Sequence, residues 1–70
     1  MEPQERFGRN LREHRLRLGM SQEELAQAAG LHPTEVSRLE RAVQDPRLST
    51  IARLARALQV EPGGLLRGVG

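Results

Sequence analysis

Few side chains in this chain could carry catalytic or metal-binding chemistry. There is no cysteine, and the two histidines, His14 and His32, are too few and too far apart to form a zinc site without other ligands. No nucleophile has a base at a useful spacing and no two carboxylates form a paired site. The only glycine pair, Gly63-Gly64, does not belong to a phosphate-binding loop. The sequence therefore predicts no enzyme, no cofactor and no metal.

Arginine is the residue type that remains for recognition. All eleven basic residues are arginines, and nine acidic residues leave a net charge of +2. A guanidinium can donate two hydrogen bonds to the O6 and N7 atoms of guanine, or it can pair with a phosphate. Phe7 is the one aromatic residue, so the chain lacks the stacking platforms that single-strand binders use.

Ser21 marks the clearest helix start in the chain. Its hydroxyl can cap the helix, and Glu24, three residues later, completes a capping box. A helix N-terminus with free N–H groups is a site for anions, and Gln22 adds an amide donor beside it. The residues predict a phosphate contact by Ser21 and Gln22; the alternative is a solvated glutamine that follows an ordinary cap.

Helix-forming residues dominate the whole chain, and strand signals are nearly absent. Seventy residues make one small domain, so we expect residues 1–70 to form a single all-α bundle of about five short helices. No apolar run approaches the length of a membrane helix and no signal peptide is visible, which predicts a cytoplasmic protein. The expected helices run from about Gln4 to Leu18, from the Ser21 cap to Gly30, from Pro33 to near Arg41, from Leu48 to Leu58 and from Pro62 to Arg67.

Apolar residues at helical spacing predict the buried face of each helix. His14 is expected to be a partly buried imidazole, and at least one of Leu65 and Leu66 is expected to close the core. The other residues expected to face inward are Phe7, Leu11, Leu18, Leu25, Ala28, Ala29, Leu31, Val36, Leu39, Ile51, Leu54, Ala55 and Leu58.

The second and third expected helices are joined so tightly that residues 21–41 form a helix-turn-helix unit. Ala26 must be small because the next helix crosses above it, and Gly30 makes the turn without a Cβ clash. His32 stands at the cap position of the third helix, and Pro33 is its first residue, where a missing N–H costs nothing.

Three stretches of the chain resemble the phage-repressor, or xenobiotic-response-element, class of helix-turn-helix regulators. They are Gly19–Gly30, the run Val36-Ser-Arg-Leu-Glu-Arg41, and Pro46 followed by Leu54–Leu58. The resemblance covers roughly residues 6–66. It implies a compact bundle that binds operator DNA, usually as a dimer.

The resemblance also implies which side chains read the DNA. The outward face of the third helix, about residues 33–41, is expected to enter the major groove. The reading positions are His32, Pro33, Thr34, Ser37 and Arg38. Arg38 is the sharpest candidate for a base contact; the alternative is a surface arginine that pairs with Glu35 or Glu40. His32 is expected to contact a phosphate or simply to cap the helix, and Pro33 to touch a thymine methyl or to serve the backbone alone.

Two further sets of residues follow from the resemblance. Arg15 is expected to pair with Glu40, which would otherwise be a carboxylate at the unfavourable end of a helix dipole. Arg41 and Arg47 flank the loop after the third helix and are expected to contact phosphates; the alternative is two solvated loop charges. Ala42 departs from the glycine or asparagine that relatives often have there.

The sequence thus predicts a regulator of transcription that binds double-stranded DNA as a weak homodimer, assembled on a palindromic site. Gly63 and Gly64 disfavour the last helix, which commonly lies at the dimer seam in relatives, so the free dimer should be weak. The rival interpretation is a protein-interaction module, such as an antitoxin-like or accessory subunit with secondary DNA binding. Residues 19–41 hold two arginines and four glutamates, a net −2 that favours this alternative slightly.

Overall fold

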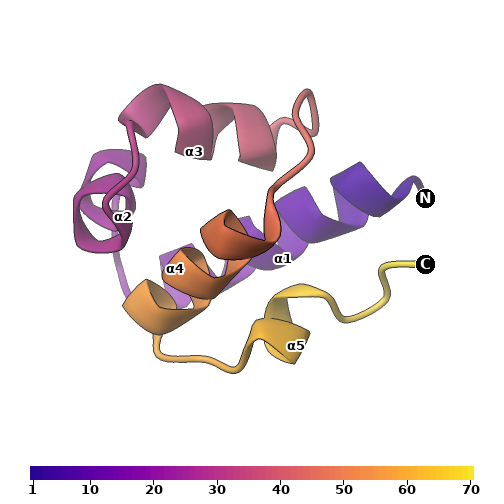
Figure 1. The fold of residues 1–70 in the computed structure, drawn as a ribbon. Coiled ribbons are helices and arrows are strands. Elements are labelled where there is room, and N and C mark those ends of the chain that lie inside the picture. The colour runs from indigo at the N-terminus through magenta and orange to yellow at the C-terminus, as the bar shows by residue number, and fades with distance from the viewer.

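Five α-helices and no strand make up the computed structural model, which describes all of residues 1–70 (Figure 1). The helices are α1 (Pro3–Arg17), α2 (Gln22–Ala29), α3 (Pro33–Glu40), α4 (Leu48–Leu58) and α5 (Pro62–Leu65). In Figure 1, α3 and α5 lie on opposite sides of the molecule, with α4 between them. The predicted all-α bundle is confirmed. None of these helices is long and apolar enough to cross a membrane.

Twelve apolar side chains form one buried cluster that receives residues from every helix. Met20 and Leu31, which flank α2, pack against this cluster while remaining partly exposed. Ala28, expected in the core, is exposed. The helical turn of 3.6 residues places Leu25, Ala26 and Ala29 on the inner side of α2 and turns Ala28 toward its flank. The cluster is Phe7, Leu11, Leu25, Ala26, Ala29, Val36, Leu39, Ile51, Leu54, Ala55, Leu58 and Leu65.

Helix α1 ends one residue earlier than expected, at Arg17. Leu18 is the C-cap of the helix, with φ −87° and ψ 0°, and its side chain is 50% exposed. The prediction that Leu18 lies on the buried face is therefore wrong, because the backbone has already left the helix there. Gly19 follows at φ 67°, a left-handed conformation that turns the chain toward α2.

Gly8 lets α1 approach the end of α3 very closely. A Cβ on Gly8 would lie 2.7 Å from the carbonyl oxygens of both Leu39 and Glu40. Any side chain at this position would push the two helices apart, since the atoms in contact belong to the backbone. The close approach fixes the C-terminal end of α3 against α1.

Helix α5 is shorter than the expected range and stops at Leu65. Its two glycines each disfavour the helix by roughly 1 kcal/mol relative to alanine. The buried amide of Asn10 also donates to the carbonyls of Leu65 (2.9 Å) and Arg67 (2.8 Å), which satisfies them without a further helical turn. Leu65 is fully buried and Leu66 is 37% exposed, so one of the two closes the core, as expected.

Candidate nucleic-acid interface

Helix α3 is held by one face and open on the other. Val36 and Leu39 are almost completely buried, at 0% and 1% exposure. The residues expected to read bases lie on the opposite side: Pro33, Thr34 and Arg38 are exposed, and Ser37 is half-buried. The helix therefore presents a short row of polar and cationic groups to solvent.

His32 caps α3 with its own ring. Nδ1 accepts a hydrogen bond from the backbone N–H of Thr34 at 3.1 Å, and the His32 carbonyl accepts one from the N–H of Glu35 at 2.9 Å. Pro33 has no N–H to satisfy. Since an accepting Nδ1 carries no proton, the neutral ring holds its proton on Nε2 in this arrangement. The exposed imidazole thus keeps one donor for a ligand while it stabilises the helix start.

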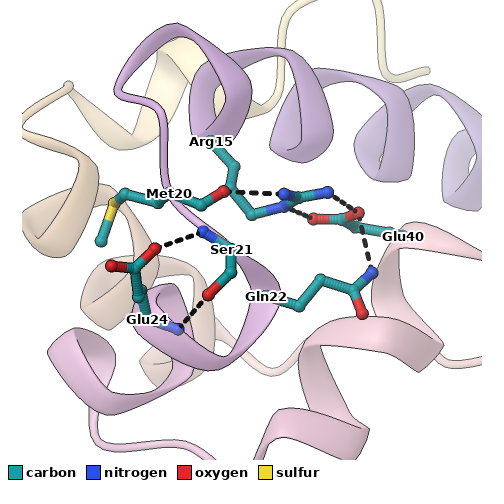
Figure 2. Close-up of polar contacts among 6 residues, drawn as sticks. All are labelled: Arg15, Met20, Ser21, Gln22, Glu24 and Glu40. Atoms are coloured by element: carbon teal, nitrogen blue, oxygen red, sulfur yellow. Dashed lines mark hydrogen bonds and ion pairs between the residues drawn. The ribbon is translucent and has the colours of Figure 1, made fainter.

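A buried ion pair fixes the other end of α3 (Figure 2). Arg15 Nε and Nη2 donate to the two carboxylate oxygens of Glu40 at 2.7 and 2.9 Å, and Arg15 Nη1 donates to the carbonyl of Met20 at 2.8 Å. The side chains of Arg15 and Glu40 are only 10% and 4% exposed. A two-pronged contact of this kind ties α1, the α1–α2 connection and α3 into one rigid unit.

The same contact shifts the titration of Arg15. Its hydrogen bonds to Glu40 raise the pKa of the guanidinium above its ordinary value; burial opposes this rise, and the charge of Glu40 adds to it. A raised pKa in the folded state means that the stabilisation is complete below the ordinary arginine pKa. It is lost only as the pH rises through the raised value, so the cation of this pair persists throughout the neutral range.

Gln22 extends the ion pair to the start of α2. Its Nε2 donates to Glu40 Oε1 at 3.1 Å, so this amide, expected at a phosphate, is engaged within the chain. The predicted capping box is present: Ser21 Oγ accepts from the Glu24 N–H at 3.0 Å, and the Ser21 N–H donates to Glu24 Oε1 at 2.8 Å (Figure 2). The N–H groups of Gln22 and Glu23 have no acceptor in the chain and stay available to an anion.

Two arginines flank the loop that follows α3. Arg41 is exposed, and its Nε donates to Ser37 Oγ at 3.3 Å. Arg47 is exposed at the cap position of α4 and gives that helix no side-chain cap. Between them Ala42 adopts φ 63°, and its N–H donates to the Leu39 carbonyl at 3.2 Å. Alanine here takes the left-handed conformation that glycine adopts at low cost.

A groove of about 610 Å³ runs between α3 and α4. It brings together four of the nine predicted residues, His32, Thr34, Arg38 and Arg47. The other five do not line it: Ser21, Gln22, Pro33, Ser37 and Arg41. Glu35 also lines the groove but forms no ion pair with Arg38, since Arg15–Glu40 is the only salt bridge in the chain.

Arg53 of α4 lines this groove as well and was missed by the sequence interpretation. It is exposed and makes no hydrogen bond or ion pair within the chain. The sequence offers one indication of its position. Arg53 follows Ser49, which also lines the groove, by four residues, and this spacing puts both on the same face of one helix. Packing of α4 against the helix-turn-helix unit is what brings it to the groove.

Comparisons with known proteins agree with this arrangement. The sequence model of the helix-turn-helix family matches residues 11–65 of the chain. The control protein C.BamHI of Bacillus amyloliquefaciens is 41% identical over 61 residues, which are 86% of this chain and 75% of that protein.

Two solved structures show the same architecture. The restriction-modification controller protein C.AhdI of Aeromonas hydrophila superposes with a TM-score of 0.87 at 42% identity, covering 89% of this chain and 94% of that one. The P22 c2 repressor, solved in complex with a synthetic operator, gives a TM-score of 0.82 at 31% identity, with 89% and 94% coverage.

Proposed function

Because the chain belongs to the helix-turn-helix family of transcriptional regulators, we propose that it binds a specific double-stranded DNA sequence with α3 in the major groove. The observation that carries the proposal is that α3 is held rigidly on one side and exposed on the other. Its inner face and C-terminal end are fixed by the core and by the Arg15–Glu40 pair, while Arg38 stays exposed and unpaired. The operator complex of the similar P22 c2 repressor supports the same use of the fold here.

In this proposal the base contacts come from the exposed side of α3. Arg38 donates twice to a guanine, a contact worth about 1–3 kcal/mol of discrimination. Thr34 and Ser37 offer hydroxyl groups to base edges, and Pro33 offers an apolar contact to a thymine methyl. Three of these four residues are exposed, and Ser37 is half-buried.

The phosphate contacts come from both sides of α3. At the start of α2, the hydroxyl of Ser21, the free N–H groups and the amide of Gln22 face one strand, the amide sharing its donors between Glu40 and the phosphate. His32 uses its Nε2 donor, while Arg41 and Arg47 approach from the loop after α3. None of these contacts depends on base sequence, so they position the protein without specifying the site.

Two copies of the chain are needed to read a palindromic site. Successive major grooves on one side of the duplex are about 34–36 Å apart, whereas the molecule is 28 Å in its longest dimension and carries one recognition helix. The C-terminal segment offers the seam, because Leu66 is 37% exposed and lines an open groove with Pro46 and Val69. This small apolar area supports a weak dimer that assembles on DNA.

The experiment that tests the proposal is selection of bound duplexes from a random pool, followed by titration of the selected duplex at several salt concentrations. We expect one enriched palindromic motif and an affinity that falls steeply with salt. A stoichiometric protein partner, combined with no binding to any duplex, would replace this proposal with the protein-interaction function. The proposal includes a cytoplasmic location, since a regulator of this kind acts where the genome is.

A further inference from the structure

The groove between α3 and α4 is lined by one cationic side chain, Arg53, that has no part in the base and phosphate contacts proposed above. Three arginines line it: Arg38 from α3, Arg47 from the loop and Arg53 from α4. Glu35 and Asp45 line it too, but neither lies within 4.0 Å of an arginine nitrogen. The cations are therefore not neutralised by direct partners, and the groove carries one net positive charge.

Arg53 reaches from α4 toward the turn between α2 and α3. Its Nη1 lies 3.9 Å from the place that a Cβ on Gly30 would occupy. Gly30 adopts φ 70° and is the C-cap of α2, two residues before His32, which caps α3. The Arg53 guanidinium therefore lies beside the start of the recognition helix, on the side of the groove.

The floor of the groove also holds polar groups without partners. Thr50 is 6% exposed, lines the groove, and makes no hydrogen bond through its hydroxyl within the chain. The backbone N–H groups of Ser49 and Thr50, which both line the groove, have no acceptor either, because the first hydrogen bond of α4 runs from Ile51 to Arg47. A hydroxyl, free N–H groups and guanidinium groups that converge on one groove suit an anion with several oxygen atoms.

We propose that Arg53 contacts a DNA phosphate and that the groove between α3 and α4 is the seat of one strand of the duplex. This inference rests on the proposed DNA binding and adds to it a residue outside the helix-turn-helix unit. The DNA strand then runs past the N-terminus of α4. Arg47 precedes Ser49 in the sequence, and Arg53 follows it one helical turn later. Arg53 adds affinity for every sequence alike, because a phosphate contact carries no base information.

The experiment compares Arg53→Ala with Arg56→Ala, a matched control that removes an exposed arginine of the same helix from outside the groove. Each variant is titrated with the selected duplex and with an unrelated duplex at about 50 to 200 mM salt, the range in which the loss of a phosphate contact is measurable. One lost phosphate contact per protomer reduces the slope of log K against log salt by about 0.9. The affinity advantage of the wild type over Arg53→Ala should then shrink about threefold to fourfold per protomer across that range, for both duplexes.

Arg53→Lys provides a second variant that retains the charge. We expect its salt slope to match the wild type, and we expect Arg56→Ala to match it too. Equal slopes for Arg53→Ala and the wild type would overturn the inference while leaving DNA binding intact, and so would a changed sequence preference with an unchanged slope. A wild-type protein that binds no duplex at all would overturn both proposals. The melting temperature of Arg53→Ala should stay close to the wild-type value, since the side chain makes no hydrogen bond or ion pair within the chain.

Discussion

The molecule uses arginine in two opposite ways on two sides of one short helix. At the C-terminal end of α3, Arg15 is buried and every contact it makes lies within the chain. Along the groove on the exposed side of α3, Arg38, Arg47 and Arg53 are exposed and unpaired. The first region holds the helix in place, and the second leaves its cations free for a ligand. The same side chain thus serves stability or binding according to whether a carboxylate was placed within its reach.

The largest effect we expect comes from breaking the buried region. Arg15→Ala leaves the Glu40 carboxylate buried without its counter-charge and should cost about 3–5 kcal/mol of unfolding free energy. Urea denaturation measures the loss. The Arg15→Lys variant keeps the charge without the two-pronged geometry, so its unfolding free energy should lie between those of the wild type and Arg15→Ala. Since small domains have total stabilities of about 5–15 kcal/mol, the lysine variant also keeps the test readable if the alanine variant does not fold.

The double variant with Glu40→Ala decides whether the two residues act as a pair. It should recover part of the combined loss, because the alanine at position 40 removes the stranded carboxylate. Losses that simply add would show that Arg15 and Glu40 are not coupled, and the contrast between the two regions would then rest on burial alone.

Breaking the exposed region should give the opposite pattern. Arg38→Ala is expected to weaken binding of the selected duplex by about 1–3 kcal/mol and to relax the preference at one base pair in each half-site. Its unfolding free energy should be unchanged, because Arg38 makes no ion pair in the chain. Repeating the duplex selection with this variant measures both points; an unchanged motif would refute a base contact by Arg38.

How much of each region could be read from the sequence follows the range of the interactions involved. The capping box at Ser21 and the helix-turn-helix unit are local patterns, so they could be predicted with nearly correct boundaries. The pairing of Arg15 with Glu40, 25 residues apart, came from a family resemblance rather than from spacing. The groove could not be predicted, because it forms only where α4, packed against α2, faces α3, and Arg53 has no distinctive neighbours in the sequence.

Leu18 and the end of α5 show that the sequence also failed to predict where a helix ends. Helical spacing predicts which face an apolar residue occupies only while the helix continues, and Leu18 lies one residue past that point. The early end of α5 depends on Asn10, whose amide crosses from α1 to two carbonyls more than 50 residues away. Propensity indicated a weak helix there, and the expected end at Arg67 lies two residues past the observed end at Leu65.

Gln22 is bonded to the buried region and also carries a proposed phosphate contact at the start of α2, so it should give an intermediate effect. Its Nε2 is bonded to Glu40 at 3.1 Å, and the residue opens α2, where a phosphate is expected. Gln22→Ala should cost about 0.5–1.5 kcal/mol of stability through the lost hydrogen bond, and it should also reduce the salt slope of DNA binding. Glu23→Ala, an exposed neighbour in the same turn, is the control for a general change at the helix start. A stability loss with an unchanged salt slope would assign Gln22 to the buried region alone.

The smallest effect lies at the joint between the two regions, where α3 ends and the loop toward α4 begins. Ala42 has φ 63°, and the left-handed conformation costs a residue with a Cβ roughly 1–2 kcal/mol. Ala42→Gly removes that strain but increases the freedom of the unfolded chain, which takes back about 0.4–1 kcal/mol. We therefore expect a net gain of about 0.5–1 kcal/mol and, for a domain of this size, a rise in melting temperature of about 2–8 °C.

Ala52→Gly is the matched control, because Ala52 is exposed within α4 and lacks a positive φ, so glycine there should destabilise the protein by about 1 kcal/mol. Opposite signs for the two substitutions would show that the loop is held in its strained form by the fixed end of α3. Destabilisation by both would mean that Ala42 leaves the left-handed region in solution, and that the buried region does not dictate the path of the loop beside the groove.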